Sequence, residues 1–176
     1  MAYYPDIGYL LPAGWNAPET IIHGHFVRRN GQAVETVCSG ADQYITVLRD
    51  PFQVVVSAYF YGKKEGMSWA TAHSLEWFME WWLKQEQGPL MSALPTIKGY
   101  RSVEDYAASF IQIGVVSRMT EFYAALGGIL GVEFAGEKIV NASAYGEDIP
   151  DLEPAFRKRF PLDFDLFDFA DRATAG

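Results

Sequence analysis

The sequence predicts an α/β fold with a mostly parallel sheet, and two observations favour this class. Short β-rich segments alternate with longer segments whose apolar residues recur at helical spacing. One β-rich segment, Tyr44 to Leu48, runs directly into Asp50-Pro51, a strong helix start because Asp caps a helix and Pro suits its first position. The chain has 176 residues, which suits one compact domain, and no internal repeat or linker divides it. We therefore expect a single domain over residues 1–176, with residues 1–19 as an irregular N-terminal segment.

The individual elements follow from local signals along the chain. Three prolines and two glycines in the first twenty residues exclude a long regular element there. Residues 20–27 are short and β-rich, and residues 28–42 are predicted to form a polar connection with turns. Further strands are expected at 44–48, 110–116 and 138–141, and helices at 51–62, 74–87, 103–109, 118–130, 150–160 and 161–173.

The composition excludes several classes of protein. The chain carries 14 Lys and Arg against 22 Asp and Glu, a formal net charge of −8, which argues against nucleic acid as a partner because duplex binding needs many basic contacts. No apolar run approaches the length of a membrane span, and the start lacks the basic region of a signal peptide. Cys38 is the only cysteine, so an intramolecular disulfide is impossible. We expect a cytoplasmic protein that does not bind membranes.

Arg49, Asp50 and Pro51, with Ser57 further along the same expected helix, form the sharpest local feature. A strand that runs into a capped helix presents free backbone N–H groups and the positive end of the helix dipole to an anion. Arg49 adds a planar, permanently charged group suited to phosphate, and Ser57 could donate its hydroxyl to the same anion. The alternative is a structural arginine that pairs with Asp50 or another carboxylate nearby.

A second feature is the pair His23 and His25, separated by Gly24. At strand spacing the two imidazoles share one face, and histidine suits a general base that takes a proton from a hydroxyl. A zinc site is a rival interpretation, with His73 or a carboxylate as the third ligand. Two semi-buried histidines at the end of a sheet are the simplest alternative.

Taken together, these motifs resemble the sulfotransferase superfamily. The segments that carry the resemblance are His23-Gly-His-Phe26, Tyr44-Ile-Thr-Val-Leu-Arg-Asp-Pro51 and Ser57-Ala-Tyr-Phe-Tyr61, with weaker likeness in the C-terminal half. The pattern is most similar to heparan sulfate 2-O-sulfotransferase and its bacterial relatives. The resemblance covers the chain from about residue 20 to its end.

The resemblance implies a three-layer α/β/α fold, like that of P-loop nucleoside triphosphatases, and transfer of a sulfuryl group from 3′-phosphoadenosine 5′-phosphosulfate to a hydroxyl of a glycan or small molecule. Arg49 and Ser57 would hold the 3′-phosphate of this donor. His25 would be the catalytic base, with His23 beside it, and no metal is expected. By analogy with phosphoryl transfer, positioning and charge stabilisation would supply most of the catalysis.

The sequence departs from the family at the phosphosulfate-binding loop. No lysine precedes His23, and no lysine elsewhere is followed by Gly-Thr or Gly-Ser. The family's first strand, loop and helix are therefore expected to be missing, through truncation or because the protein is a non-catalytic nucleotide-binding remnant. A His-ligated metal hydrolase is a third alternative. An incomplete sheet would leave an unpaired edge, so a homodimer is the oligomer that we consider.

Overall fold

Two parallel strands, β1 (Tyr44–Leu48) and β2 (Phe110–Val115), form the sheet in the part of the chain that the computed structural model describes, which is residues 33–37, 41, 43–134 and 148–174. Tyr44 lies opposite Phe110 and Leu48 lies opposite Val115, with one irregularity in register after Tyr44. Both strands therefore end at the same edge of the sheet. A helix leaves this edge from each strand.

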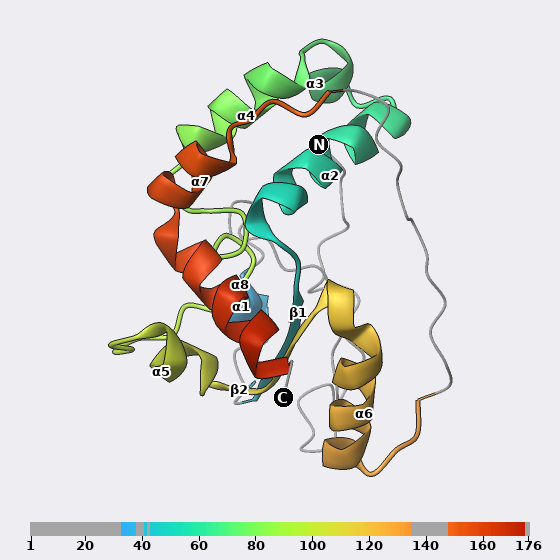
Figure 1. The fold of residues 1–176 in the computed structure, drawn as a ribbon, viewed down its shortest axis with the longest axis vertical. Helices are drawn as coiled ribbons and strands as arrows, with labels where there is room; N and C mark the ends of the chain where they lie inside the picture. The colour runs from blue at the N-terminus through green and yellow to red at the C-terminus, as the bar shows by residue number, and fades with distance from the viewer. Residues whose placement is uncertain (1–32, 38–40, 42, 135–147, 175–176) are drawn as a thin grey trace.

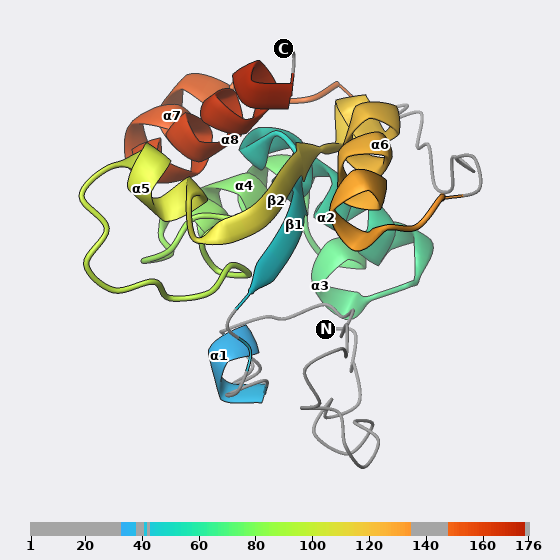
Figure 2. The same cartoon turned by 90° about the horizontal axis from the view of Figure 1, so that it is seen from below.

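The helices in chain order are α1 (Val34–Val37), α2 (Pro51–Lys64), α3 (Ser68–Thr71), α4 (Leu75–Leu83), α5 (Val103–Ala107), α6 (Met119–Leu130), α7 (Glu153–Arg159) and α8 (Pro161–Thr174). A short 3₁₀ turn, η3 (Val116–Arg118), separates β2 from α6. Figure 1 shows α2 continuing upward from the end of β1, with α3, α4 and α7 beside it. Seen from below, α8 and α6 lie on opposite sides of the two strands (Figure 2).

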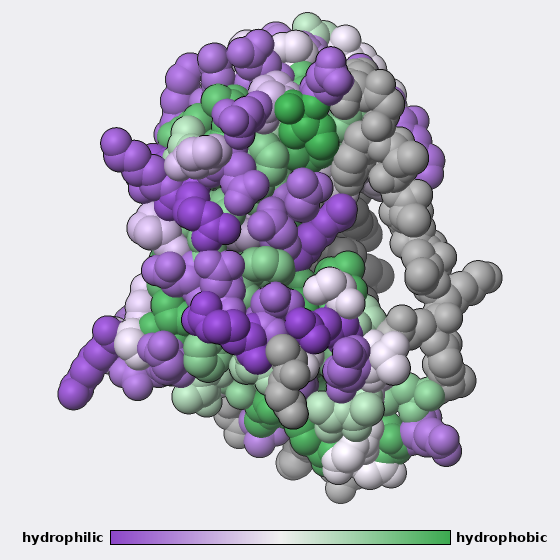
Figure 3. Space-filling view, viewed as in Figure 1, coloured by the Kyte–Doolittle hydropathy of each residue, from purple (hydrophilic) through white to green (hydrophobic). Residues whose placement is uncertain are grey.

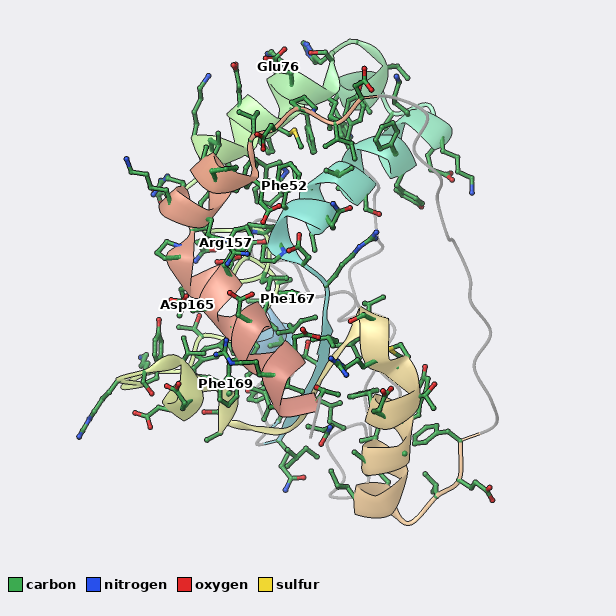
Figure 4. All side chains as sticks on the ribbon, viewed as in Figure 1. Phe52, Glu76, Arg157, Asp165, Phe167 and Phe169 are labelled. Carbon is green, nitrogen blue, oxygen red and sulfur yellow. The ribbon has the colours of Figure 1, made fainter. Side chains whose placement is uncertain are left out.

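One apolar cluster joins α2 to its neighbouring helices. The buried face of α2 supplies Phe52, Val55, Val56 and Tyr59, which pack against buried residues of α4 and α7. The Phe52 and Phe156 rings meet edge to face at 5.6 Å, and Figure 4 shows Phe52 on the side of α2 that faces α7. This packing buries one face of α2, so a site on this helix must use the opposite face.

A second apolar cluster lies between the strands, α5 and α8. Leu48, Val115 and Leu166 are among its fully buried members. Asp163, in the first turn of α8, is 2% exposed, and its Oδ1 accepts hydrogen bonds from the backbone N–H groups of Leu90 (2.6 Å) and Met91 (3.2 Å). Burial raises the pKa of Asp163 to about 6, although these hydrogen bonds act to lower it. The carboxyl group thus ties the turn after α4 to α8.

The contact between α6 and the sheet depends on a glycine. Gly114 of β2 is buried, and a Cβ atom at this position would lie on the ring of Phe122. The absence of a side chain lets α6 approach the strand closely. Gly131, at φ 66°, then ends α6 in the left-handed conformation that glycine adopts without strain.

The structure confirms the α/β class and most of the expected elements to within a few residues. The expected polar connection at 28–42 is wrong in one respect, because α1 occupies residues 34–37. The short helix α3 was not expected at all. The expected β-rich segment at 20–27, the strand at 138–141 and the irregular segment at 1–19 lie outside the described residues. Among the described helices, none combines the length and the apolar character needed to cross a membrane.

Candidate anion-binding site at the start of α2

The start of α2 is held by its own cap. Asp50 Oδ1 accepts a hydrogen bond from the backbone N–H of Gln53 at 2.8 Å, and Pro51 occupies the first helical position. The Asp50 carbonyl accepts the first helical hydrogen bond, from Val54 N–H at 2.9 Å. The Asp50 carboxylate is thus engaged in capping the helix.

Arg49 and Ser57 lie together at this helix start. The guanidinium Nη1 of Arg49 donates a hydrogen bond to Ser57 Oγ at 2.9 Å, and both residues are half-buried. Arg49 is placed by the end of β1 and Ser57 by the second turn of α2, whose opposite face is fixed in the core. The sequence predicted these two groups to act on one ligand, and the structure brings them into direct contact.

This arrangement suits an oxyanion. A guanidinium presents five N–H donors in a planar, permanently charged fork whose geometry matches the oxygens of a phosphate or sulfate group. Because the Ser57 oxygen accepts the hydrogen bond from Arg49, its own O–H remains able to donate. Two donor groups of different kinds, at the positive end of a 14-residue helix, match the geometry and charge of a phosphate or sulfate group.

The predicted histidine pair, His23 and His25, lies outside the described residues, so the structure does not place it relative to Arg49. His73, the third metal ligand considered, stands just before α4. Its ring stacks on Trp77 with a centroid distance of 3.7 Å and an interplanar angle of 12°, and its backbone oxygen accepts a hydrogen bond from Tyr59 Oη at 2.8 Å. No cluster of three or more potential metal ligands occurs within the described ranges.

A second arginine, Arg118, follows β2 at the same sheet edge and was not predicted as a site residue. Its Nε lies 3.2 Å from Asp171 Oδ1 of α8, and both side chains are partly exposed. The signal was present in the sequence, since Arg118 follows the second expected strand much as Arg49 follows the first. The structure assigns Arg118 a contact with α8.

Two tryptophans of α4, Trp77 and Trp81, differ in their surroundings. Trp81 is half-buried and packs against the core cluster beside α2, with its ring stacked on Phe78 at 5.8 Å. Trp77 is exposed, and Figure 4 shows its neighbour Glu76 on the outer side of α4. Trp81 therefore contributes to the core, whereas the ring of Trp77 stacks on that of His73.

No family model, no curated protein and no solved structure matches this chain. What supports a function is the contact between Arg49 and Ser57 at the start of α2, together with the sulfotransferase-like motifs of the sequence.

Proposed function

We propose that the protein binds 3′-phosphoadenosine 5′-phosphosulfate at the start of α2 and transfers its sulfuryl group to a hydroxyl of a glycan or small molecule. The observation that carries the proposal is the 2.9 Å hydrogen bond between Arg49 Nη1 and Ser57 Oγ beside the capped helix start. This pair supplies the donors expected around the 3′-phosphate of the nucleotide.

The binding step follows from the charges at the site. The 3′-phosphate takes up N–H donors of Arg49 and the hydroxyl proton of Ser57, and the helix dipole of α2 favours its negative charge. Asp50 serves this step indirectly, because its bond to Gln53 N–H fixes the direction of the first turn. The site needs no rearrangement to bring Arg49 and Ser57 together, which limits the entropy lost on binding.

In the transfer step, His25 acts as the general base. The acceptor oxygen forms a bond to sulfur while the bond between sulfur and the 5′-phosphate oxygen breaks, so adenosine 3′,5′-bisphosphate leaves with the electron pair. The acceptor proton passes to His25, and His23 supports the orientation of that imidazole. In-line geometry and charge stabilisation account for most of the rate enhancement in this type of transfer.

Isothermal titration with adenosine 3′,5′-bisphosphate tests the binding step. We expect Arg49→Ala to weaken binding by at least about thirtyfold, because it removes a charged partner of the phosphate. Ser57→Ala should weaken binding at least about tenfold, because a hydrogen bond to a charged phosphate contributes roughly 1.5–3 kcal/mol. Arg101→Ala is the matched control, since Arg101 is an exposed arginine before α5, and it should leave the affinity unchanged. No binding to the unmodified protein, or equal loss in Arg49→Ala and Arg101→Ala, contradicts the site.

A sulfate-transfer assay with radiolabelled donor tests the chemistry. Over a panel of glycan and phenol acceptors, the unmodified protein should give product, and His25→Ala should abolish it without changing the affinity for the bisphosphate. A non-catalytic nucleotide-binding protein is the second candidate, favoured by the missing lysine-containing phosphosulfate loop. That candidate is supported if the nucleotide binds through Arg49 and no acceptor is sulfated.

Elemental analysis separates both candidates from a metal hydrolase that uses His23 and His25. A stoichiometric metal ion in the purified protein, lost in His23→Ala, would favour the hydrolase and contradict the sulfotransferase proposal.

A further inference from the structure

Helix α8 carries four aspartates and buries one of them. Asp165 is exposed, and Asp168 and Asp171 are partly exposed, each paired with an arginine. The surface over α7 and α8 is accordingly mostly hydrophilic (Figure 3). Asp163 instead lies on the inner side of the helix and is 2% exposed. A carboxyl group in this position is costly to ionise, because water no longer solvates its charge.

The segment that Asp163 holds belongs to a long irregular connection. Residues 84–102 join α4 to α5 without a helix or a strand. Connections longer than about 12–15 residues are uncommon in compact domains and are often functional. Arg159 holds one point of this connection by a hydrogen bond to the backbone oxygen of Gln85 at 2.7 Å. Tyr106 Oη holds a second point, the backbone oxygen of Pro95, at 2.8 Å.

The part of the connection between these two points, residues 86–94, is called the strap below. Leu90 and Leu94 of the strap are 6% and 7% exposed, and both belong to the second apolar cluster. The strap also has hydrogen bonds of its own. The N–H of Leu94 donates to the Leu90 oxygen at 3.1 Å, and the N–H of Ser92 donates to the Gly88 oxygen at 3.0 Å. The strap can therefore move as a unit between its two fixed ends.

Asp163 attaches the middle of the strap to α8. Its Oδ1 accepts hydrogen bonds from the N–H groups of Leu90 and Met91. A Cβ atom at Gly88 would lie on the same carboxyl group, so the strap lies directly against it. A change in the charge of Asp163 therefore acts on the strap first.

Among the described residues, no positive charge compensates an ionised Asp163. Burial raises its pKa, and the groups that oppose this rise are backbone N–H groups. The carboxylate Glu104 of α5 lies under the influence of Arg172, towards the other end of α8, and β2 has no charged residue. The charged side chains of the other elements around Asp163 are exposed or bonded elsewhere, namely Glu86, Asp50, Arg157, Arg159, Asp165 and Asp168. Loss of the proton thus leaves a buried charge without a counter-ion.

We propose that the strap is closed over the second apolar cluster while Asp163 is protonated and is released from α8 when Asp163 loses its proton to water. In the closed form, the neutral carboxyl group accepts the two hydrogen bonds through Oδ1 and keeps its proton on the other oxygen. In the released form, water solvates the carboxylate and the freed N–H groups. The closed form holds the proton more tightly than the released form does. Release therefore becomes easier as the pH rises from about 4 to about 6, and no easier above about pH 7.

Release of the strap changes the surroundings of α2. Val54 of α2 packs against the cluster that the strap covers, and it lies three residues before Ser57. The strap is thus a pH-sensitive cover beside the proposed anion site. The inference does not depend on the proposed sulfotransferase activity, and neither result decides the other.

Hydrogen exchange of single backbone amides, measured by NMR on the full chain at pH 5 and pH 7.5, tests the proposal. After correction for the intrinsic exchange rate, opening at Leu90 and Met91 should increase about tenfold, the ratio set by a pKa of about 6 in the closed form and 3.8 in the released form. Val56, fully buried on α2, reports unfolding of the whole molecule and should exchange at least tenfold more slowly than Leu90 at pH 7.5. Equal protection of Leu90 and Val56 overturns the proposal, and so does protection of Leu90 that does not change with pH.

Two variants of α8 form a matched pair for the same measurement. Asp163→Asn keeps an acceptor oxygen for the strap and cannot titrate, so opening at Leu90 should not depend on pH. Asp165→Asn removes an exposed carboxylate two residues further along the helix (Figure 4) and should retain the tenfold increase. Opening that still rises with pH in Asp163→Asn contradicts the role of this carboxyl group. If Asp163→Asn does not fold, the comparison of Leu90 with Val56 in the unmodified chain decides alone.

Discussion

The two strand-to-helix junctions at the carboxyl edge of the sheet differ in how they use an arginine. After β1, Arg49 turns to Ser57 of the helix that follows immediately, and Asp50 caps that helix. After β2, a 3₁₀ turn intervenes, and Arg118 stands at the start of α6 without a side-chain cap. Arg118 instead contacts Asp171 of α8.

The difference shows which surroundings set Arg49, the arginine of the proposed anion site, apart from Arg118. At the first junction, a separate residue caps the helix and a hydroxyl lies two turns along the same face. At the second junction, neither feature is present and a carboxylate of a neighbouring helix is close enough to take the guanidinium. Under the proposed function, a strand-end arginine serves an anion where a separate cap and a second donor accompany it, as at the first junction.

The largest expected effect concerns α8, which carries partly exposed Asp171 beside Arg118 and buried Asp163 near its start. Because burial raises the pKa of Asp163 to about 6, above its ordinary value of 3.8, the folded state holds this proton more tightly than the unfolded state. The stabilisation of the folded state by this proton is complete below pH 4 and is lost as the pH rises to about 6. Its total size is on the order of 3 kcal/mol in the free energy of unfolding.

Urea unfolding at several pH values measures this effect. Asp163→Asn keeps an oxygen acceptor for Leu90 and Met91 and removes the titration. Relative to the variant, the unmodified protein should therefore lose stability between pH 4 and 6 and change no further above pH 7. Parallel pH dependence in the two proteins contradicts the assignment. Asp171→Asn, which alters a partly exposed ion pair, is the control and should shift the curve little.

The next effect tests how closely the second junction is packed. Gly114→Val places a side chain where Phe122 lies, so α6 must move away from β2, at a cost of about 2 kcal/mol in the free energy of unfolding. Gly128→Ala, in α6, is the control, since a Cβ atom at Gly128 meets nothing within 4 Å. The control should gain up to about 1 kcal/mol from helix propensity. Equal effects of the two changes would show that α6 does not pack on Gly114.

A smaller effect is expected from the cap of the first junction. Asp50→Ala leaves the N–H of Gln53 without its partner and should lower the free energy of unfolding by about 1 kcal/mol. Because the cap orients the first turn, the affinity for adenosine 3′,5′-bisphosphate should fall as well. Asp50→Asn retains the acceptor oxygen and should restore both quantities. If Asp50→Asn lowers the nucleotide affinity as much as Asp50→Ala does, the charge of Asp50 matters for binding, rather than its cap.

The smallest effect belongs to Arg118. Its pair with Asp171 is partly exposed, so Arg118→Ala should change the free energy of unfolding by less than about 1 kcal/mol. The variant should bind the bisphosphate as tightly as the unmodified protein, in contrast to Arg49→Ala. A loss of nucleotide affinity comparable with that of Arg49→Ala would erase the distinction between the two junctions.

Much of this structure could be predicted because its signals are local. Asp50 and Pro51 mark the start of α2, Ser74 caps α4, and Gly131 ends α6. Arg49 and Ser57 lie eight residues apart in one junction, so local spacing was enough to expect them at one site, although their direct hydrogen bond was not predicted. The α/β class followed from the same local patterns.

Other features depend on contacts that no local pattern shows. Asp163 belongs to a helix of alternating acidic and aromatic residues, and its burial against Leu90 requires a turn 73 residues earlier in the chain. Arg159 likewise donates hydrogen bonds to the backbone oxygens of Leu83 (3.2 Å), the last residue of α4, and of Gln85 (2.7 Å), just beyond it. The short helices α1 and α3, of four residues each, are too brief to leave a periodic pattern.

The pairing of β1 with β2 also has a kinetic consequence. Leu48 and Val115 face each other although 67 residues separate them, so the chain must close a long loop before these strands pair. Helix α2 and the contact from Arg49 to Ser57 need no such closure, since both form within one short stretch. During folding the two groups should therefore meet in the first microseconds, as helices form. The sheet edge from which they project should be completed only in the slow final phase.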